Sequence, residues 1–252
     1  MAIRKRTHVP VEAIILEISD ISDGHQDVLL LIPGIRNSGF LGRQIKEVIY
    51  AHGSPVKPRR IHYGRYGLLR FLTEIILPCL RERNTINEIS RKITDEIALA
   101  NGRRVSVLCH SNATKLLAEV CRTRDYKFHR VILFASVCRE RDIKALAEKC
   151  GRVVNVVARR DRVPILAEAI FPWRFARTGQ SGSHEDWAED IFYSYSHNDI
   201  FNNDVIKDII VPIIMFSKIE YKFNVTGLSS LESPTTYRLV ALFVAIAYLL
   251  IR

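Results

Sequence analysis

Short apolar runs alternate with amphipathic segments along most of this 252-residue chain, and this pattern constrains the fold more than any other feature. The runs are rich in Val, Ile and Leu, whereas the segments between them repeat apolar residues at helical spacing. Strands that alternate with helices in this way form a mostly parallel sheet covered on both faces. The predicted fold class is therefore α/β. The predicted strands are 11–18, 27–32, 60–63, 105–108, 130–135, 153–157 and 191–195, and the predicted helices are 40–51, 68–100 with a break at Pro78, 114–122, 142–149 and one that begins near Ile200.

The segment VSVLCHSNATK, residues 105–115, places a serine at a predicted strand-to-helix corner. A corner of this kind raises a hydroxyl above the carboxyl edge of a parallel sheet. It also points the first N–H groups of the helix at whatever binds there. Ser111 is therefore a candidate nucleophile. Ser and Asn are also common helix N-caps, so an ordinary cap is the alternative interpretation.

Two further polar residues follow predicted strands, at the edge where parallel α/β sheets bind ligands. Asp161 follows the strand 153–157, and His197 follows the strand 191–195. Together with Ser111 they give the order serine, acid, histidine, which is the order found in α/β hydrolases. Asp161 lies among arginines, so a surface ion pair is its alternative role.

The chain resembles serine hydrolases of the α/β-hydrolase superfamily over roughly residues 10–212. LLLIPGI resembles the oxyanion loop after the third strand, and LCHSNA resembles the nucleophile elbow. ARRDRV resembles the acid turn, and YSHNDIF resembles the histidine turn before the final helix. The four pieces occur in the order of that superfamily, so the resemblance implies its fold, a mostly parallel sheet with helices on both faces.

The resemblance also implies a role for each site residue. Ser111 would attack a carbonyl carbon, His197 would take its proton and later protonate the leaving group, and Asp161 would orient the imidazole. The backbone N–H groups of Ile35 and Asn112 would form the oxyanion hole. No cofactor and no metal is implied.

The elbow departs from the usual pattern G-x-S-x-G. Cys109 and Ala113 occupy the two glycine positions, so the turn must accommodate two Cβ atoms. Pro33 also precedes Gly34 where many relatives have histidine. These departures are the best support for an alternative, a non-catalytic interaction protein that keeps the fold.

The base has an alternative as well. His184, in the stretch GSHED, also follows Asp161. We prefer His197 because residues 191–193 can form a strand before it and the following Asn and Asp can cap a helix. Otherwise each histidine would have a surface or capping role. We interpret His110 as a packing or hydrogen-bonding neighbour of the elbow, and the Cys109 thiol as a small buried hydrophobic group.

The composition of the chain limits the classes of partner and ligand that we expect. The chain has 37 Lys and Arg against 27 Asp and Glu, a net charge of +10, but the basic residues are scattered in small clusters. We interpret them as solvated surface and expect no nucleic-acid partner. The five cysteines have neither CxxC nor metal-ligand spacing, which argues against a zinc site or a disulfide framework. The same cysteine pattern fits a reducing compartment, and the amino terminus shows no apolar export signal, so we expect a cytoplasmic location, with membrane association as an alternative.

The carboxyl end carries an uninterrupted apolar run, 239–251, between two arginines. As a helix it would be about 20 Å long, short for a hydrocarbon core of about 30 Å. We therefore predict a hydrolase domain at 1–215 and a C-terminal extension at 216–252. The extension would contact a membrane surface or a partner through its apolar run, or form a buried helix.

The function predicted from these observations is cleavage of a carboxylic ester or thioester through an acyl-serine intermediate, with a small-molecule or lipid substrate. Apolar residues in 64–78 and 164–182 could line an acyl pocket, although core packing explains them equally well. An amidase or peptidase would use the same residues, because the triad does not select the leaving group.

Overall fold

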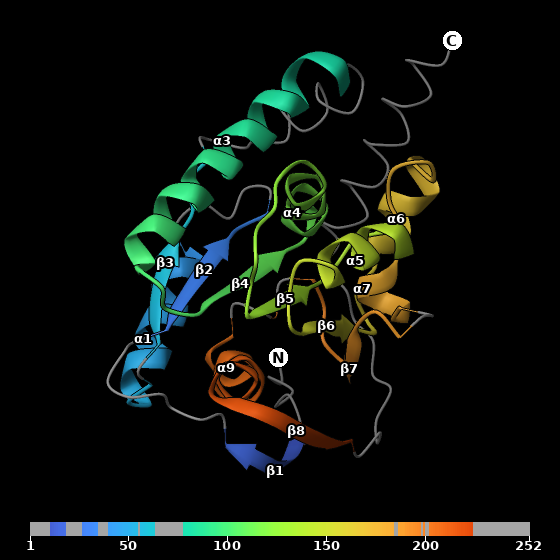
Figure 1. Ribbon diagram of the computed structural model, residues 1–252. Helices are drawn as coiled ribbons and strands as arrows, with labels where there is room; N and C mark the ends of the chain where they lie inside the picture. Colours follow the sequence, from blue (N-terminus) through green and yellow to red (C-terminus); the bar gives the residue numbers. More distant parts are fainter. Residues whose placement is uncertain are drawn as a thin grey trace.

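A six-stranded parallel sheet forms the centre of the molecule (Figure 1). The computed structural model describes residues 11–18, 27–34, 40–54, 56–63, 78–183, 186–197, 199 and 202–223. The strands run in the order β3-β2-β4-β5-β6-β7, and every neighbouring pair is parallel. Their bounds are β2 Val28–Ile32, β3 Lys57–Arg60, β4 Val105–His110, β5 Arg130–Phe134, β6 Val153–Ala158 and β7 Glu189–Tyr193. The predicted α/β class is confirmed.

Helices cover both faces of this sheet (Figure 1). They are α1 Phe40–Ala51, α3 Pro78–Ala100, α4 Asn112–Thr123, α5 Glu140–Ala147, α6 Val163–Ile170, α7 Thr178–Ser181, α8 Asn203–Val205 and α9 Val211–Met215, with a π-helical segment, Ile206–Ile210, joining the last two. Helices α3, α4 and α5 share one apolar core with the sheet. Helix α1 and the helical stretch 203–215 share the other core.

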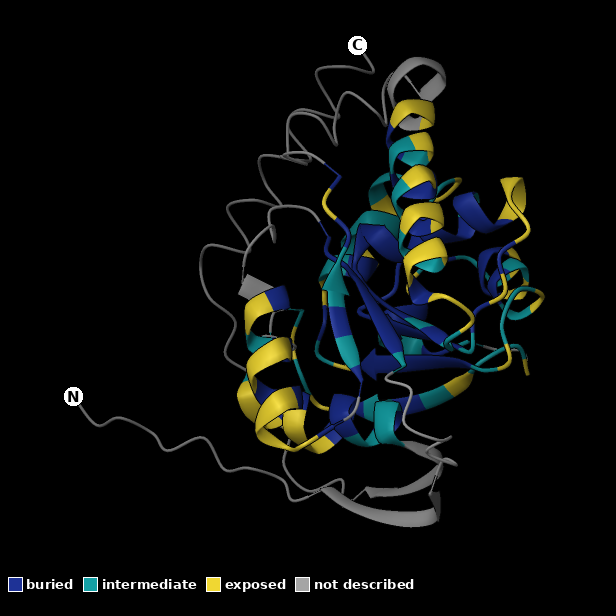
Figure 2. Ribbon diagram, turned by 60° about the vertical axis from the view of Figure 1, so that its left-hand side comes forward, coloured by how far each residue is buried: buried dark blue, intermediate teal, exposed yellow. Residues whose placement is uncertain are grey.

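The central strands lack polar alternation because both of their faces are buried, as Figure 2 shows for the middle of the sheet. On β2 the residues Val28, Leu30 and Ile32 join the core beneath α3 and α4. Leu29 and Leu31, between them, join the core beneath α1. The period of two thus supplies side chains to two cores at once.

The strand order reverses between β2 and β4. The chain places β3 on the outer side of β2, then returns to add β4 on the inner side and continues toward β7. The loops that follow β2 and β4 therefore leave in different directions, and such a switch point is where open α/β sheets bind ligands. This is the position of the LCHSNA segment.

Some boundaries differ from the predicted ones for local reasons. Strand β3 ends at Arg60, and only the N–H of Ile61 still reaches β2, at Leu31. Pro58 is tolerated in β3 because this strand is at the edge. Helix α5 begins two residues early because the Asp142 carboxylate accepts from the Arg139 N–H at 2.8 Å and so caps the helix from its third position.

The two ends of the described chain pair with each other. Strand β1, Val11–Ile18, is antiparallel to β8, Phe216–Phe223, in a separate two-stranded sheet (Figure 1). In the register of the two strands, Glu12 is paired with Lys222 and Glu17 with Lys218. The first strand of the predicted domain is thus hydrogen-bonded to residues that we assigned to the extension.

The apolar run 239–251 lies outside the described residues. Within the described ranges, no helix is both long enough and apolar enough to cross a membrane.

Candidate active site

Ser111 is the single residue between β4 and α4, and its backbone is strained. Its φ of 56° and ψ of −132° lie outside the regions that non-glycine residues prefer. Hydrogen bonds hold it there: its N–H donates to the Phe134 carbonyl at 2.9 Å, and its carbonyl accepts from the Thr114 N–H at 3.0 Å. The predicted sharp corner is therefore present. No hydrogen bond to another described residue engages the Ser111 hydroxyl.

The glycine that the corner needs lies opposite it rather than within it. A Cβ on Gly34 would lie 2.8 Å from the His110 carbonyl oxygen and 2.9 Å from the Ser111 Cβ, so only glycine allows this approach. Cys109 and Ala113, at the usual glycine positions, are fully buried in the apolar core. The loop after β2 is held in place by the Tyr63 hydroxyl, which donates to the Pro33 carbonyl.

Asp161 and His197 are hydrogen-bonded to each other. The His197 Nδ1 donates to Asp161 Oδ2 at 2.7 Å, and Asp161 Oδ1 accepts from the Val163 N–H at 2.9 Å. Because a carboxylate only accepts, the proton of the neutral imidazole is on Nδ1 and Nε2 carries the lone pair. Asp161 is 1% exposed, so it is not a surface ion-pair partner.

His110 joins the elbow to the histidine turn. Its ring is buried, and its Nε2 donates to the His197 carbonyl oxygen at 3.1 Å. The centroids of the two imidazole rings are 4.9 Å apart. Ser111 and His197 are not hydrogen-bonded to each other.

The other predicted site residues lie partly within and partly outside the described ranges. Asn112 is the first residue of α4 and is buried, so its backbone N–H directly follows Ser111. Ile35 and His184 lie outside the described residues. Of the apolar residues suggested for a pocket, Phe175 is buried in the core, whereas Trp173 is 63% exposed.

The architecture can be compared with known proteins. No protein-family model matches the chain, and no curated protein does. A structure described as a predicted CIB-like hydrolase from Thermoplasma acidophilum is similar with a TM-score of 0.50 and 11% identity, covering 82% of this chain and 99% of that chain. This agreement extends to the parallel sheet and the helices around it. The chain has the α/β-hydrolase fold.

Other structures of this fold give similar values. An alpha-beta serine hydrolase homologue from Coxiella burnetii gives a TM-score of 0.49 at 12% identity over 81% of this chain and 91% of that chain. The pyrethroid hydrolase PytH gives 0.49 at 12% identity over 75% of this chain and 97% of that chain. At such identities the likeness concerns the fold alone.

In this α/β-hydrolase fold, a row of hydroxyl groups from Thr114, Ser136 and Thr178 is connected to the backbone of Ser111. The sequence did not reveal this row. Thr114 Oγ1 donates to the Ser111 carbonyl at 2.7 Å and accepts from the Val137 N–H at 3.3 Å. Ser136 Oγ lies 3.5 Å from Thr114 Oγ1 and 3.2 Å from Thr178 Oγ1. The row of hydroxyl groups thus links α7 to the strained Ser111. Its members come from distant segments, so no local pattern marks them.

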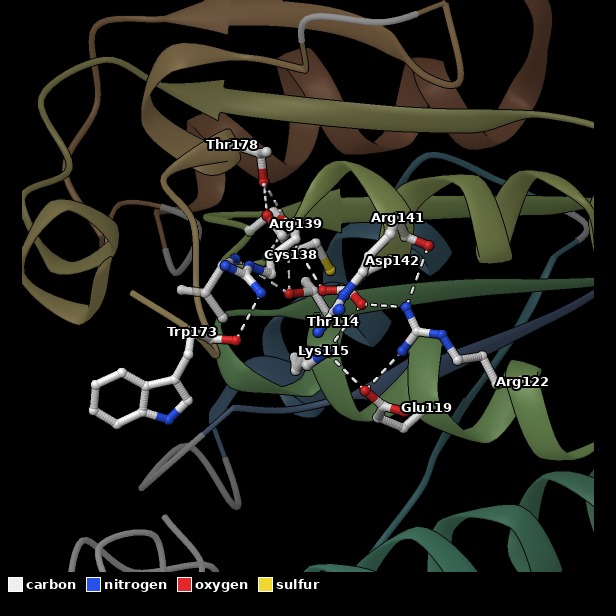
Figure 3. Close-up of polar contacts among 12 residues, drawn as sticks. Thr114, Lys115, Glu119, Arg122, Cys138, Arg139, Arg141, Asp142, Trp173 and Thr178 are labelled. Atoms are coloured by element: carbon white, nitrogen blue, oxygen red, sulfur yellow. Dashed lines mark hydrogen bonds and ion pairs between the residues drawn. The ribbon is translucent and has the colours of Figure 1, made fainter. Parts of the chain in front are cut away.

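A buried ionic cluster fixes α5 against α4 (Figure 3). Lys115 Nζ donates to Asp142 Oδ1 at 2.9 Å and to Glu119 Oε1 at 2.7 Å, and Arg122 also pairs with Asp142. Burial alone would raise the pKa of Asp142, but Lys115, Arg122 and the Arg139 N–H together hold that pKa below its ordinary value. The carboxylate therefore stays charged and paired.

The buried His110 makes stability depend on pH. Burial, and to a lesser extent the adjacent His197, lower the pKa of His110 from 6.5 to about 3. Below pH 6.5 the imidazole of His110 is therefore protonated in the unfolded chain but stays neutral in the folded chain. The free energy of unfolding consequently decreases as pH falls toward 3. Between pH 7 and pH 5 we expect this group to remove about 2 kcal/mol of unfolding free energy.

Urea denaturation at the two pH values measures this loss, with His110→Gln as the matched variant that cannot titrate. The variant should lose distinctly less stability between pH 7 and pH 5 than the wild type. Equal losses in the two proteins would show that His110 is not the responsible group.

Proposed function

We propose that this chain is a serine hydrolase that cleaves a carboxylic ester or thioester through an acyl-Ser111 intermediate. One observation carries the proposal: a buried aspartate is hydrogen-bonded to a histidine at the same sheet edge where a serine occupies a strained strand-to-helix corner. Strain of this kind occurs preferentially where function requires it. The α/β-hydrolase fold supports the proposal because it places these three turns at the ends of β4, β6 and β7.

The proposed reaction uses each group once in each half. Ser111 Oγ attacks the carbonyl carbon while His197 Nε2 takes the hydroxyl proton. The protonated imidazole, paired through Nδ1 with Asp161, then gives that proton to the departing alcohol or thiol. Water repeats the sequence on the acyl-enzyme: it loses a proton to Nε2, attacks the carbonyl carbon, and Ser111 recovers its proton as the acid leaves.

The negative oxygen formed in each half needs donors. We propose the backbone N–H of Asn112, next to Ser111, and that of Ile35, which follows the closely packed Gly34. Backbone donors fixed before the reaction stabilise the developing charge without reorganisation, and loss of one typically costs roughly a hundredfold or more in rate.

The proposal is tested with a set of chromogenic substrates. We expect p-nitrophenyl acetate and butyrate, and the corresponding thioesters, to be hydrolysed, with a burst of product equal to the enzyme concentration if deacylation is slow. The p-nitroanilides of the same acids should react far more slowly. Faster hydrolysis of the anilides than of the esters would indicate an amidase. If the folded protein hydrolysed none of these substrates, a non-catalytic interaction protein would be favoured.

We also propose that the run 239–251 mediates contact with a membrane or a partner. Its length and continuous apolar character support an interfacial role. Deleting residues 237–252 should move the protein from the membrane fraction to the soluble fraction of lysed cells. An unchanged distribution would contradict the contact with a membrane.

A further inference from the structure

His110, the residue directly before Ser111, makes a contact that the triad chemistry does not use. It is the last residue of β4, its side chain is 1% exposed, and its Nε2–H donates to the main-chain carbonyl of His197 at 3.1 Å. The two rings also touch, with centroids 4.9 Å apart and planes inclined by 48°. One side chain thus contacts the histidine turn through both its main chain and its ring.

The histidine turn needs such an anchor. The His197 side chain is 17% exposed, and in the described part of the chain its ring forms one hydrogen bond, from Nδ1 to Asp161. That bond selects the tautomer, but it leaves the ring free to pivot about the contact. Around it the chain forms a local turn, with the Ser196 N–H donating to Asp199 Oδ2 at 2.7 Å. The bond from His110 ties this turn to β4.

The His110 ring is also fixed on its other side. A Cβ on Gly34 would lie 3.2 Å from His110 Nδ1, so the loop after β2 packs closely against the ring. Buried and with a pKa of about 3, the ring remains neutral at ordinary pH. It therefore keeps the Nε2 proton that it donates to the carbonyl, and it places no positive charge beside the imidazolium that would form on His197.

We propose that His110 is a positioning residue that holds the His197 imidazole in register with the Ser111 hydroxyl, by anchoring the histidine turn to the elbow strand. This inference rests on the proposed function, because it assigns His197 as the base. His110 would thus give the strand-to-helix corner a second role: the corner holds Ser111, and through His110 it also fixes the proposed base, His197. His110 itself does not touch the reacting atoms.

Two matched variants separate positioning from simple core filling. His110→Leu keeps an apolar side chain of similar bulk but has no donor, whereas His110→Gln keeps an N–H donor at comparable reach. We expect His110→Leu to lower kcat about tenfold to a hundredfold with little change in KM, since small displacements of a reacting group have effects of this size. His110→Gln should recover most of that loss. Equal kcat in the two variants would overturn the proposal.

A second measurement does not require activity. In the wild type the proton on His197 Nδ1, bonded to Asp161, should give a downfield proton resonance. In His110→Leu this signal should broaden through faster exchange with water, and in His110→Gln it should remain sharp. An unaltered signal in folded His110→Leu would contradict the anchor. Absence of wild-type esterase activity with the expected change in this signal would refute the hydrolase and leave the anchor standing.

Discussion

Replacing Ser111 with alanine is expected to lower kcat for ester hydrolysis by a factor on the order of 10⁴ or more, while leaving the fold intact. The hydroxyl is the attacking group of the proposed reaction, and no other side chain of the elbow can replace it. The Cys109 thiol is fully buried, and burial raises its pKa, so the thiolate needed for attack does not form there.

The same substitution should change stability by less than about 1 kcal/mol, because it leaves no partner unsatisfied. Ser111 is bonded through its main chain, and Ala retains both contacts. Ser106→Ala is the matched control, since Ser106 lies on the same strand five positions before the elbow. Initial rates with p-nitrophenyl butyrate and urea denaturation of each variant give the comparison. Retention of more than a tenth of wild-type kcat in Ser111→Ala would exclude this nucleophile.

Replacing Asp142 with alanine is expected to destabilise the fold by roughly 3–5 kcal/mol. The carboxylate is fully buried and forms ion pairs with Lys115 and Arg122. It also accepts the hydrogen bond from the Arg139 N–H that caps α5. Its removal leaves the Lys115 ammonium, whose side chain is 5% exposed, with Glu119 as its remaining partner in the cluster. Most of the expected loss comes from the buried Lys115 ammonium, which keeps one of its two carboxylate partners in the cluster.

A double variant tests this explanation. Lys115→Met combined with Asp142→Leu removes both buried charges together, so it should be considerably more stable than Asp142→Ala alone. Glu148→Ala, at the exposed end of α5, is the control and should change stability by about 0.5 kcal/mol or less. Thermal and urea unfolding measure all three proteins. If Asp142→Ala unfolded like the control, the cluster would not support the fold.

The approach of Asp161 to His197 could be anticipated because both follow strands of one parallel sheet, and β6 and β7 are neighbours. The close packing of Gly34 against the corner could not be anticipated from the sequence. It depends on the register that places Ile32 beside Cys109, which single-sequence patterns do not determine. This packing explains how a corner with Cys109 and Ala113 can still form: the space that elbow glycines usually provide is supplied by the facing loop.

The buried ionic cluster was missed for a different reason. Lys115 and Asp142 lie on amphipathic helices, where charged residues normally face solvent, so the pattern gives no sign of their burial. Their burial follows from the packing of α4 on α5, two helices that meet only in the folded chain. The pairing of β1 with β8 is likewise a contact between segments that are far apart in sequence.

We propose Ser111 as an activated nucleophile, and covalent labelling with a fluorophosphonate is the decisive experiment. The measurement is the intact mass of folded protein after labelling, followed by proteolysis to locate the adduct. We expect one adduct per chain, located on Ser111, absent in Ser111→Ala and slow to form in His197→Ala. A folded wild-type protein that takes no adduct, or that takes it on another residue, would rule out Ser111 as the nucleophile.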